Sequence, residues 1–269
     1  MKRPDCSSLL ILFVTLPWCM FAACSPVGEI ADPYYVRIDR QMENLYYVPS
    51  KPNTPLSADK NALNFEITSS SGDPTSGVDL QTSFLPTERL GIIAGYSMAR
   101  DKGTESIDKV NQKRFELGAG YLVPMSKGWH YETYAGIGTG NIRNNHHTGN
   151  SMIRHSVYFV QPAIAYNNPK RTFTFGFLSR FSGVNFSVRE QYFIPERELY
   201  TTGQFLLLHE KPFHLMWEPA LVIKGGWRNF KFHLSYTYSA DLTNSELQRQ
   251  SELFSIGASL SFDTRKSRK

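Results

Sequence analysis

The sequence contains little cysteine and no long apolar run, and both shortages restrict the class of protein it can encode. Its three cysteines, Cys6, Cys19 and Cys24, all precede residue 25 of the 269-residue chain. A disulfide scaffold, a zinc ribbon and a cysteine hydrolase are therefore excluded for the rest of it. A mean hydropathy of -0.34 with 41% hydrophobic residues excludes both a bundle of apolar transmembrane helices and a disordered chain.

The positive charge is concentrated at one end of the chain. The net charge is +5 and the isoelectric point is near 9.0. Four of the basic residues stand together in the C-terminal tail, residues 263–269: Arg265, Lys266, Arg268 and Lys269. Because the remaining chain is nearly neutral, we expect no nucleic-acid partner.

The N-terminal residues have the pattern of a secretory leader. Lys2 and Arg3 precede an apolar stretch that Pro17 interrupts, and the stretch is shorter than the ~20 residues of a membrane-spanning helix. A retained signal anchor is the alternative. The pattern predicts a cleaved signal peptide over residues 1–23.

The residues around Cys24 indicate lipid attachment. Ala22 and Ala23 directly before Cys24 resemble the bacterial lipobox, in which the cysteine is acylated with palmitate-type chains and becomes the mature N-terminus. Ser25 follows in place of an aspartate, which by resemblance to proteobacterial sorting rules directs export to the outer membrane. We therefore expect a lipid-anchored protein of the bacterial outer membrane.

The rest of the chain divides by its periodicity. Residues 25–60 hold five prolines and no sustained period, which predicts a flexible lipidated tether over 24–60. From residue 61 to 262 a period of two recurs, and the basic tail 263–269 follows. In one such segment Phe115, Leu117 and Tyr121 share an apolar face, while Glu116 and Gly118 share the opposite face. This alternation predicts strands between two unlike environments.

Ten segments carry this alternation. They are residues 61–70, 78–86, 89–100, 113–125, 129–142, 153–167, 171–186, 213–225, 229–240 and 252–262. Most reach or exceed the ~9–11 residues that a tilted strand needs to cross a bilayer. Their connections alternate between short turns and longer polar loops, which is typical of outer-membrane barrels. The sequence predicts an all-β, antiparallel up-and-down transmembrane barrel of about ten strands, with eight as the alternative.

A soluble barrel remains a second interpretation, because a lipocalin-like carrier also has strands of period two. Its apolar face would point inward, however, and would crowd many aromatic side chains into a narrow interior. The opposite assignment places glycine and serine in the lumen and aromatic residues toward lipid. Trp129, Trp217, Trp227 and Tyr238 then fall near strand ends, where interfacial aromatic residues belong.

Several short motifs resemble a known family. They are Tyr47-Val48-Pro49, the glycine-rich runs 116–121 and 134–140, Gln161-Pro162, Glu218-Pro219 and Gly225-Gly226-Trp227. Together they resemble outer-membrane β-barrel lipoproteins of the Bacteroidetes type, whose function is uncharacterised. The resemblance implies an acylated N-terminus and a barrel, and it brings no catalytic residues.

The strand phase also predicts a set of charged side chains in the lumen. They are Glu66, Glu116, Glu132, Arg180, Glu218, Lys224, Lys231 and His233. Buried charges need partners, and a ten-stranded barrel is narrow, so we expect a salt-bridged plug; a small-ligand pocket and a proton-linked site are the alternatives. His155 and Ser156 point to opposite faces and cannot act together.

We expect no cofactor, no metal site and no catalytic residue. The leading hypothesis is a non-enzymatic barrel with a structural or binding role through its long outward loops, above all residues 187–212. A lipid-modifying barrel enzyme and a tethered soluble carrier are the alternatives. The expected partners are outer-membrane lipid and an unknown extracellular or periplasmic molecule.

Overall fold

The structure is a computed structural model, and it describes residues 45–52, 60–102, 109–146, 149–193, 208–243 and 247–264. All of these belong to one compact unit that spans residues 41–269. The leader, Cys24 and most of the basic tail lie outside the described residues. No helix within the described part of the chain has the length and hydropathy that crossing a membrane requires.

In the described part of the chain, eleven strands make up a single sheet. They are β1 Ala62–Ser71, β2 Thr75–Phe84, β3 Leu90–Asp101, β4 Lys109–Pro124, β5 Trp129–His146, β6 Gly149–Asn167, β7 Phe173–Phe193, β8 Phe213–Gly226, β9 Phe230–Tyr238, β10 Ala240–Asp241 and β11 Glu252–Asp263. A short 3-10 helix, η2 Ser126–Gly128, forms the turn between β4 and β5. The short β10 continues β9 after one residue, and both pair with β8.

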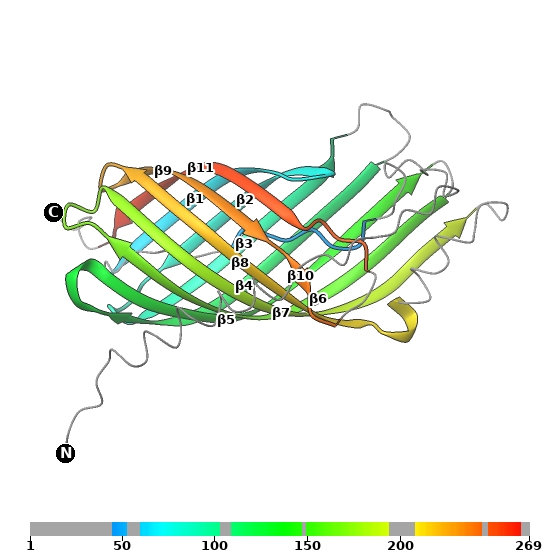
Figure 1. The fold of residues 1–269 in the computed structure, drawn as a ribbon, viewed down its shortest axis with the longest axis horizontal. Helices are drawn as coiled ribbons and strands as arrows, with labels where there is room; N and C mark the ends of the chain where they lie inside the picture. Colours follow the sequence, from blue (N-terminus) through cyan, green and yellow to red (C-terminus); the bar gives the residue numbers. More distant parts are fainter. Residues whose placement is uncertain are drawn as a thin grey trace, which may run out of the picture. The chain divides into compact units, whose positions relative to one another are not determined.

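The sheet closes into a barrel. Each strand from β1 to β8 pairs antiparallel with the next, and β11 pairs with both β9 and β1. Figure 1 shows the tilted strands wrapping around a common interior. Since β10 extends β9, the wall has ten strands, as the sequence predicts. We call the end with the connections β2–β3, β4–β5, β6–β7 and β8–β9 the turn end, and the opposite end the loop end.

Four strands run further toward the loop end than the sequence pattern indicates. The stretch 143–152, expected to be a polar loop, belongs mostly to β5 and β6, which pair as far as His146 and Gly149. Strand β7 continues to Phe193, beyond the expected limit of 186, and β4 begins at Lys109. The alternation of apolar and polar residues does not predict this extension, because both faces of these strand ends carry polar residues such as Asn144 and Asn145.

The outer wall is apolar. Phe65, Leu80, Ile137 and Tyr158 are between 47% and 60% exposed, and many other large hydrophobic side chains share their side of the sheet. This is opposite to the arrangement that a soluble lipocalin-like carrier requires, because water would face the apolar side. An apolar outer face on a closed antiparallel wall without free edges is the construction of a transmembrane β-barrel.

The interior is filled by the inward-facing side chains of the strands and by a chain segment that is not itself a wall strand. Leu221 is 45% exposed, whereas its neighbour Val222 is 1% exposed inside, which agrees with the predicted phase. Residues 45–52, which we call the lumen segment, are all buried. They belong to the stretch expected to be a tether, yet they lie inside the barrel, where Leu45 and Val48 join an apolar cluster with inward side chains of the wall.

Inward-facing glycines make room for these side chains. A Cβ atom at Gly120 would lie 2.4 Å from the ring of Tyr134, and one at Gly138 would lie 2.8 Å from Cγ of Glu116. The glycine-rich inner faces of β4 and β5 thus allow large residues of neighbouring strands to cross the lumen.

Candidate functional site

The lumen is the candidate site, because it gathers the buried charges and the lumen segment. The segment is held first through its backbone. The side-chain amide of Gln112 accepts from Val48 N at 3.0 Å and donates to Val48 O at 2.9 Å. Tyr46 N donates to Gln248 O and Gln250 N donates to Tyr47 O. The chain between β10 and β11 therefore pairs with the segment at the loop end.

Tyr47 and Arg114 join the segment to the charged groups of the wall. The hydroxyl of Tyr47 donates to Oε1 of Glu218 at 2.8 Å and accepts from Nη1 of Arg114 at 3.2 Å. The guanidinium of Arg114 also lies 5.2 Å from the Tyr47 ring centre and donates through Nη2 to Val48 O at 3.0 Å. Both side chains are almost fully buried, so these contacts fix the segment in the interior.

The first group of charges, which we call the Arg180 cluster, lies beside Tyr47. Arg180 donates from Nη1 and Nη2 to the two carboxylate oxygens of Glu116, at 2.9 and 2.7 Å. Its Nε lies 3.3 Å from Oε2 of Glu218 and donates to Ser182 Oγ at 2.9 Å. Nε of Arg114 lies 3.5 Å from Glu116. Two arginines face two carboxylates, so the cluster is electrically balanced.

The second group, which we call the Glu66 cluster, lies nearer the turn end. Lys51 of the lumen segment forms an ion pair with Oε1 of Glu66, and Nζ of Lys224 lies 2.8 Å from Oε2. Nε2 of His233 lies 3.0 Å from Nζ of Lys51 and 3.2 Å from Oγ1 of Thr68. One carboxylate thus serves two lysines, one from the wall and one from the segment.

The structure brings together six of the eight residues that the sequence predicts for the lumen. Glu116, Arg180 and Glu218 meet in the Arg180 cluster. Glu66, Lys224 and His233 meet in the Glu66 cluster. Lys231 instead donates to Oγ1 of Thr174 at 3.1 Å, near the turn end, and Glu132 is fully buried on β5.

Sequence reasoning missed Arg114, Tyr47 and Lys51. Arg114 precedes Glu116 by two residues on the same strand, so the alternation that identified Glu116 could have identified it as well. Tyr47 and Lys51 carry no periodic signal, because the lumen segment is not one of the wall strands. Its bridge from Tyr47 joins Arg249 in the connection between β10 and β11. The apolar run Leu45 to Val48 within a proline-containing stretch is the single hint that this part becomes buried.

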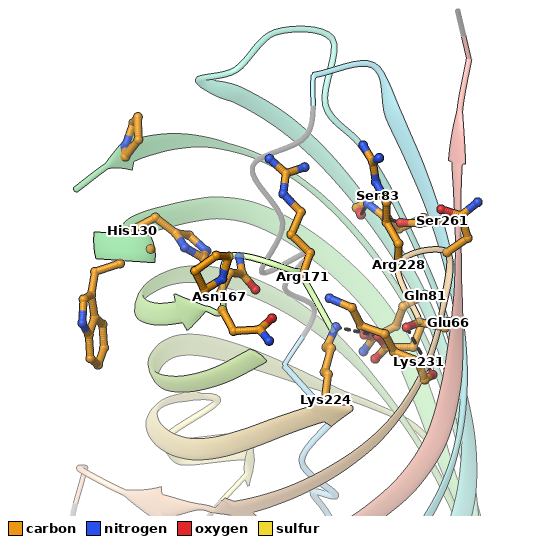
Figure 2. A pocket seen from close by; sticks show the side chains of 18 of the residues that line it. Glu66, Gln81, Ser83, His130, Asn167, Arg171, Lys224, Arg228, Lys231 and Ser261 are labelled. Carbon is orange, nitrogen blue, oxygen red and sulfur yellow. Dashed lines mark hydrogen bonds and ion pairs between the residues drawn. The ribbon is translucent and has the colours of Figure 1, made fainter. Parts of the chain in front are cut away.

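A cavity of about 310 Å³ occupies the lumen at the turn end. Figure 2 shows Arg171 and Arg228 at its mouth and Glu66 joined to Lys224 further in. Among the described residues, no group of three or more His, Cys, Asp or Glu side chains is arranged to hold a metal ion. His155 is buried in the lumen and Ser156 is exposed on the other face, as their adjacent positions on β6 require.

Comparison with known proteins adds similarities of fold at low sequence identity. No protein-family model matches the chain, and no curated protein matches it. Among solved structures, the chain is similar to the KdgM porin, with 12% identity and a TM-score of 0.38 over 74% of this chain and 99% of that one. It is also similar to the translocator domain of the autotransporter NalP from Neisseria meningitidis, with 9% identity and a TM-score of 0.43 over 75% and 88%. The β domain of the Bordetella autotransporter BrkA is similar with 10% identity and a TM-score of 0.42, over 76% of this chain and 100% of that one.

Proposed function

We propose that this protein is a bacterial outer-membrane barrel whose lumen is closed by its own lumen segment, and that it has a structural or binding role instead of serving as a diffusion pore or an enzyme. The observation that carries the proposal is the burial of residues 45–52 between the Arg180 cluster and the Glu66 cluster. Ten strands enclose a narrow interior, whereas open aqueous channels need ~16. A peptide inside such a lumen leaves little space for solutes.

The outer membrane is the location that fits the wall. The outward face is apolar on every long strand, and aromatic side chains such as Trp129 and Trp227 lie exposed at the turn end. Trp129 packs against Tyr166 with ring centres 5.4 Å apart. Amphipathic rings at one rim are the feature expected where a membrane meets water. At the loop end the connections β3–β4, β7–β8 and β10–β11 are longer than any at the turn end, whereas β1–β2 and β5–β6 are short. The three longer connections support an orientation with the loop end outside the cell.

Lipid attachment at Cys24 belongs to the same proposal. The lumen segment comes nearest the loop end at Leu45, whose backbone N–H bonds to the side chain of Asn144 at 3.3 Å, near the end of β5. The lumen segment thus reaches the loop end at its first described residue. A chain that crossed the bilayer outside the wall would leave its peptide groups unpaired in hydrocarbon. An acyl chain on Cys24 would then insert into the outer leaflet.

Binding would involve the loop end, where the wall extends beyond the length a bilayer requires. Strands β5, β6 and β7 have 18, 19 and 21 residues, compared with the ~9–11 that span a membrane. Inside this extension, Phe186, Leu208 and Leu247 pack with Tyr46 and Tyr47 in one apolar cluster. A filled interior gives the projecting strands a fixed shape on which connecting loops can present a binding surface.

Heat-dependent gel migration tests the barrel, and lipid assays test its role. The detergent-extracted full chain should migrate differently before and after boiling, because a closed membrane barrel stays folded in detergent. Purified protein should release no fatty acid from phospholipid or lipid A. Identical migration with solubility in the absence of detergent would support the soluble carrier, and fatty-acid release would support the enzyme; either result would overturn the proposal.

A further inference from the structure

Lysine and arginine are distributed unevenly over the outer face of the wall. In the described strands, six of them are exposed, and all six lie near the loop end on the neighbouring strands β3 to β7: Arg100, Lys109, Lys113, Arg143, Arg154 and Arg189. The outward positions of β1, β2, β8, β9 and β11 carry neither lysine nor arginine. Positive charge therefore gathers on one side of the barrel, at one of its ends.

Four of these side chains are diagonal neighbours across β3 to β6, and we call them the cationic patch: Arg100, Lys113, Arg143 and Arg154. Arg100 and Arg143 both pair in register with Asn111 of β4. Lys113 and Arg154 both pair with Asn141 of β5. Diagonal neighbours on adjacent strands have Cα atoms ~7–8 Å apart, so two or three of these long side chains can contact one anion together.

The carboxylates of β3 to β6 do not share this face. They are Asp101, Glu116 and Glu132. Glu116 and Glu132 are buried in the lumen, and Asp101 has the inward phase because it pairs in register with the buried Thr75. Among the described residues, none of the four patch cations pairs with a carboxylate.

The one hydrogen bond described for a patch side chain is weak. Nη2 of Arg143 donates to Sδ of Met152 at 3.9 Å, and a thioether sulfur is a poor acceptor. The donors of the patch are therefore available to an anion outside the wall. Guanidinium groups suit phosphate in particular, because their N–H groups match two phosphate oxygens at once.

The surface next to the patch changes from hydroxyl groups to hydrocarbon in the direction of the turn end. Thr139 and Ser156 are exposed register partners in the row after Lys113 and Arg154. Leu117, Ile137 and Tyr158 form the next row and are 46%, 60% and 59% exposed. An anionic lipid has the same order of groups, with a charged head, a hydroxyl-bearing region and acyl chains.

The patch also lies at the height of lipid headgroups. Arg154 is twelve positions before Tyr166 on β6, and Tyr166 packs against Trp129 at the turn-end rim. At ~3.3 Å per residue and a tilt of ~40°, this separation is about 30 Å along the barrel axis, slightly more than the ~25 Å apolar band of such barrels. Strands β4 to β7 lie side by side in Figure 1, so the patch forms one continuous surface.

The extent of the patch exceeds what a single phosphate group can contact. From β3 to β6 it crosses three strand spacings, which is ~14 Å. Two phosphate groups on one headgroup match four cations over this distance better than one does. Clusters of lysine and arginine beside an apolar membrane surface bind anionic lipid headgroups by this kind of charge complementarity.

We propose that the cationic patch binds a glycolipid of the outer leaflet that carries more than one phosphate group. The patch holds the phosphates, Thr139 and Ser156 bond to sugar hydroxyl groups, and the acyl chains lie along Leu117, Ile137 and Tyr158. This site rests on the proposed function, because the loop end must face outward for the patch to reach the outer leaflet.

Binding of the full chain to bis-phosphorylated lipid A in neutral detergent micelles tests the patch, with phosphatidylglycerol and phosphatidylcholine as comparison lipids. Lipid A should bind more tightly than phosphatidylglycerol, and phosphatidylcholine should not bind. The double variant Lys113→Gln/Arg154→Gln should weaken lipid A binding about tenfold or more, because two charge-assisted contacts are lost. Arg89→Gln/Lys170→Gln is the matched control, since it removes one arginine and one lysine that are exposed at the turn end.

Heat-dependent migration verifies that each variant is a folded barrel before affinities are compared. Absence of lipid A binding, or equal weakening in the two double variants, would overturn the proposal. Phosphatidylglycerol binding as tight as lipid A binding would overturn the assignment to a multiply phosphorylated lipid. Micelles contain no leaflets, so these results do not depend on orientation, and surface labelling of intact cells separately reveals a failure of the proposed orientation.

Discussion

The hydroxyl of Tyr47 donates a 2.8 Å hydrogen bond to Oε1 of Glu218, which joins the lumen segment to β8 across 171 positions of sequence. Both side chains are 0% exposed. Glu218 also lies 3.3 Å from Nε of Arg180, its register partner on β7. Because a buried carboxylate depends on every donor around it, this contact couples the position of the segment to the stability of the wall.

Tyr47→Phe should destabilise the barrel. The substitution keeps the ring in its apolar cluster but removes the donor to Glu218, and a buried acceptor left without a partner costs ~1–3 kcal/mol. The urea midpoint of unfolding from lipid vesicles measures the effect. Tyr158→Phe is the control, because Tyr158 is 59% exposed on the outer face and should leave the midpoint unchanged. Equal midpoints for both variants would show that the Tyr47 bond does not hold the segment.

Glu218→Ala should destabilise the barrel more strongly than Tyr47→Phe. It removes one of the two carboxylates that face Arg180, together with the acceptor of Tyr47 and Ser182. Breaking a fully buried pair costs ~3–5 kcal/mol, less where water enters. The same urea unfolding measures it, with Glu210→Ala at an exposed position as control. A stable Glu218→Ala barrel that has lost a bound small molecule would instead identify the Arg180 cluster as a ligand site.

Neighbouring substitutions on β2 should separate the two faces of the wall. Leu80 is 48% exposed outside, whereas Gln81 is 8% exposed and lines the turn-end cavity. Leu80→Glu should reduce insertion into vesicles, at a cost below the ~2–4 kcal/mol of an arginine near the midplane. Gln81→Glu places the same charge in the cavity that Lys224 also lines, loses the bond from Nε2 to Lys51 O, and should still insert better than Leu80→Glu. Equal or reversed insertion yields would be inconsistent with the assigned faces.

Cys24→Ser should abolish acylation and change nothing in the barrel. Mature protein from a bacterial host with lipoprotein processing should carry acyl mass on Cys24, and the variant should lack it while still showing heat-dependent migration. In the proposed orientation, an epitope inserted between Cys24 and Leu45 should be accessible on intact cells. Acyl mass in the Cys24→Ser variant refutes the lipid attachment, and an epitope detected only after lysis refutes the outer-leaflet orientation.

The wall could be predicted from sequence because each strand faces two unlike environments. Alternation such as Phe115 and Leu117 against Glu116 repeats at every strand, so number, order and phase follow from a local pattern. The extension of β5 to His146 and the earlier start of β6 at Gly149 could not be predicted. Neighbouring residues such as Asn144 and Asn145 point to opposite faces, and both are polar. In these segments the strand conformation depends on pairing with the neighbouring strand, and the alternation of polar and apolar residues does not indicate that pairing.

The sequence predicts which charged residues of the strands face the lumen, but only in part how they pair with one another. The phase alone placed Glu66, Glu116 and Glu218 in the lumen, but their partners depend on where the chain before β1 runs. Lys51 and Tyr47 reach those carboxylates because the lumen segment folds into the barrel, a contact between residues far apart in sequence. Local patterns contain no information on such a contact.

Single-channel conductance in planar bilayers tests the closed lumen most directly. The wild-type barrel should insert without steady ion conductance, and a variant with residues 45–52 replaced by a Gly/Ser linker of equal length should conduct, because the linker lacks the side chains that fill the lumen. Heat-dependent migration verifies that the variant remains a barrel. Steady conductance of the wild type, equal to that of the folded linker variant, would contradict the account.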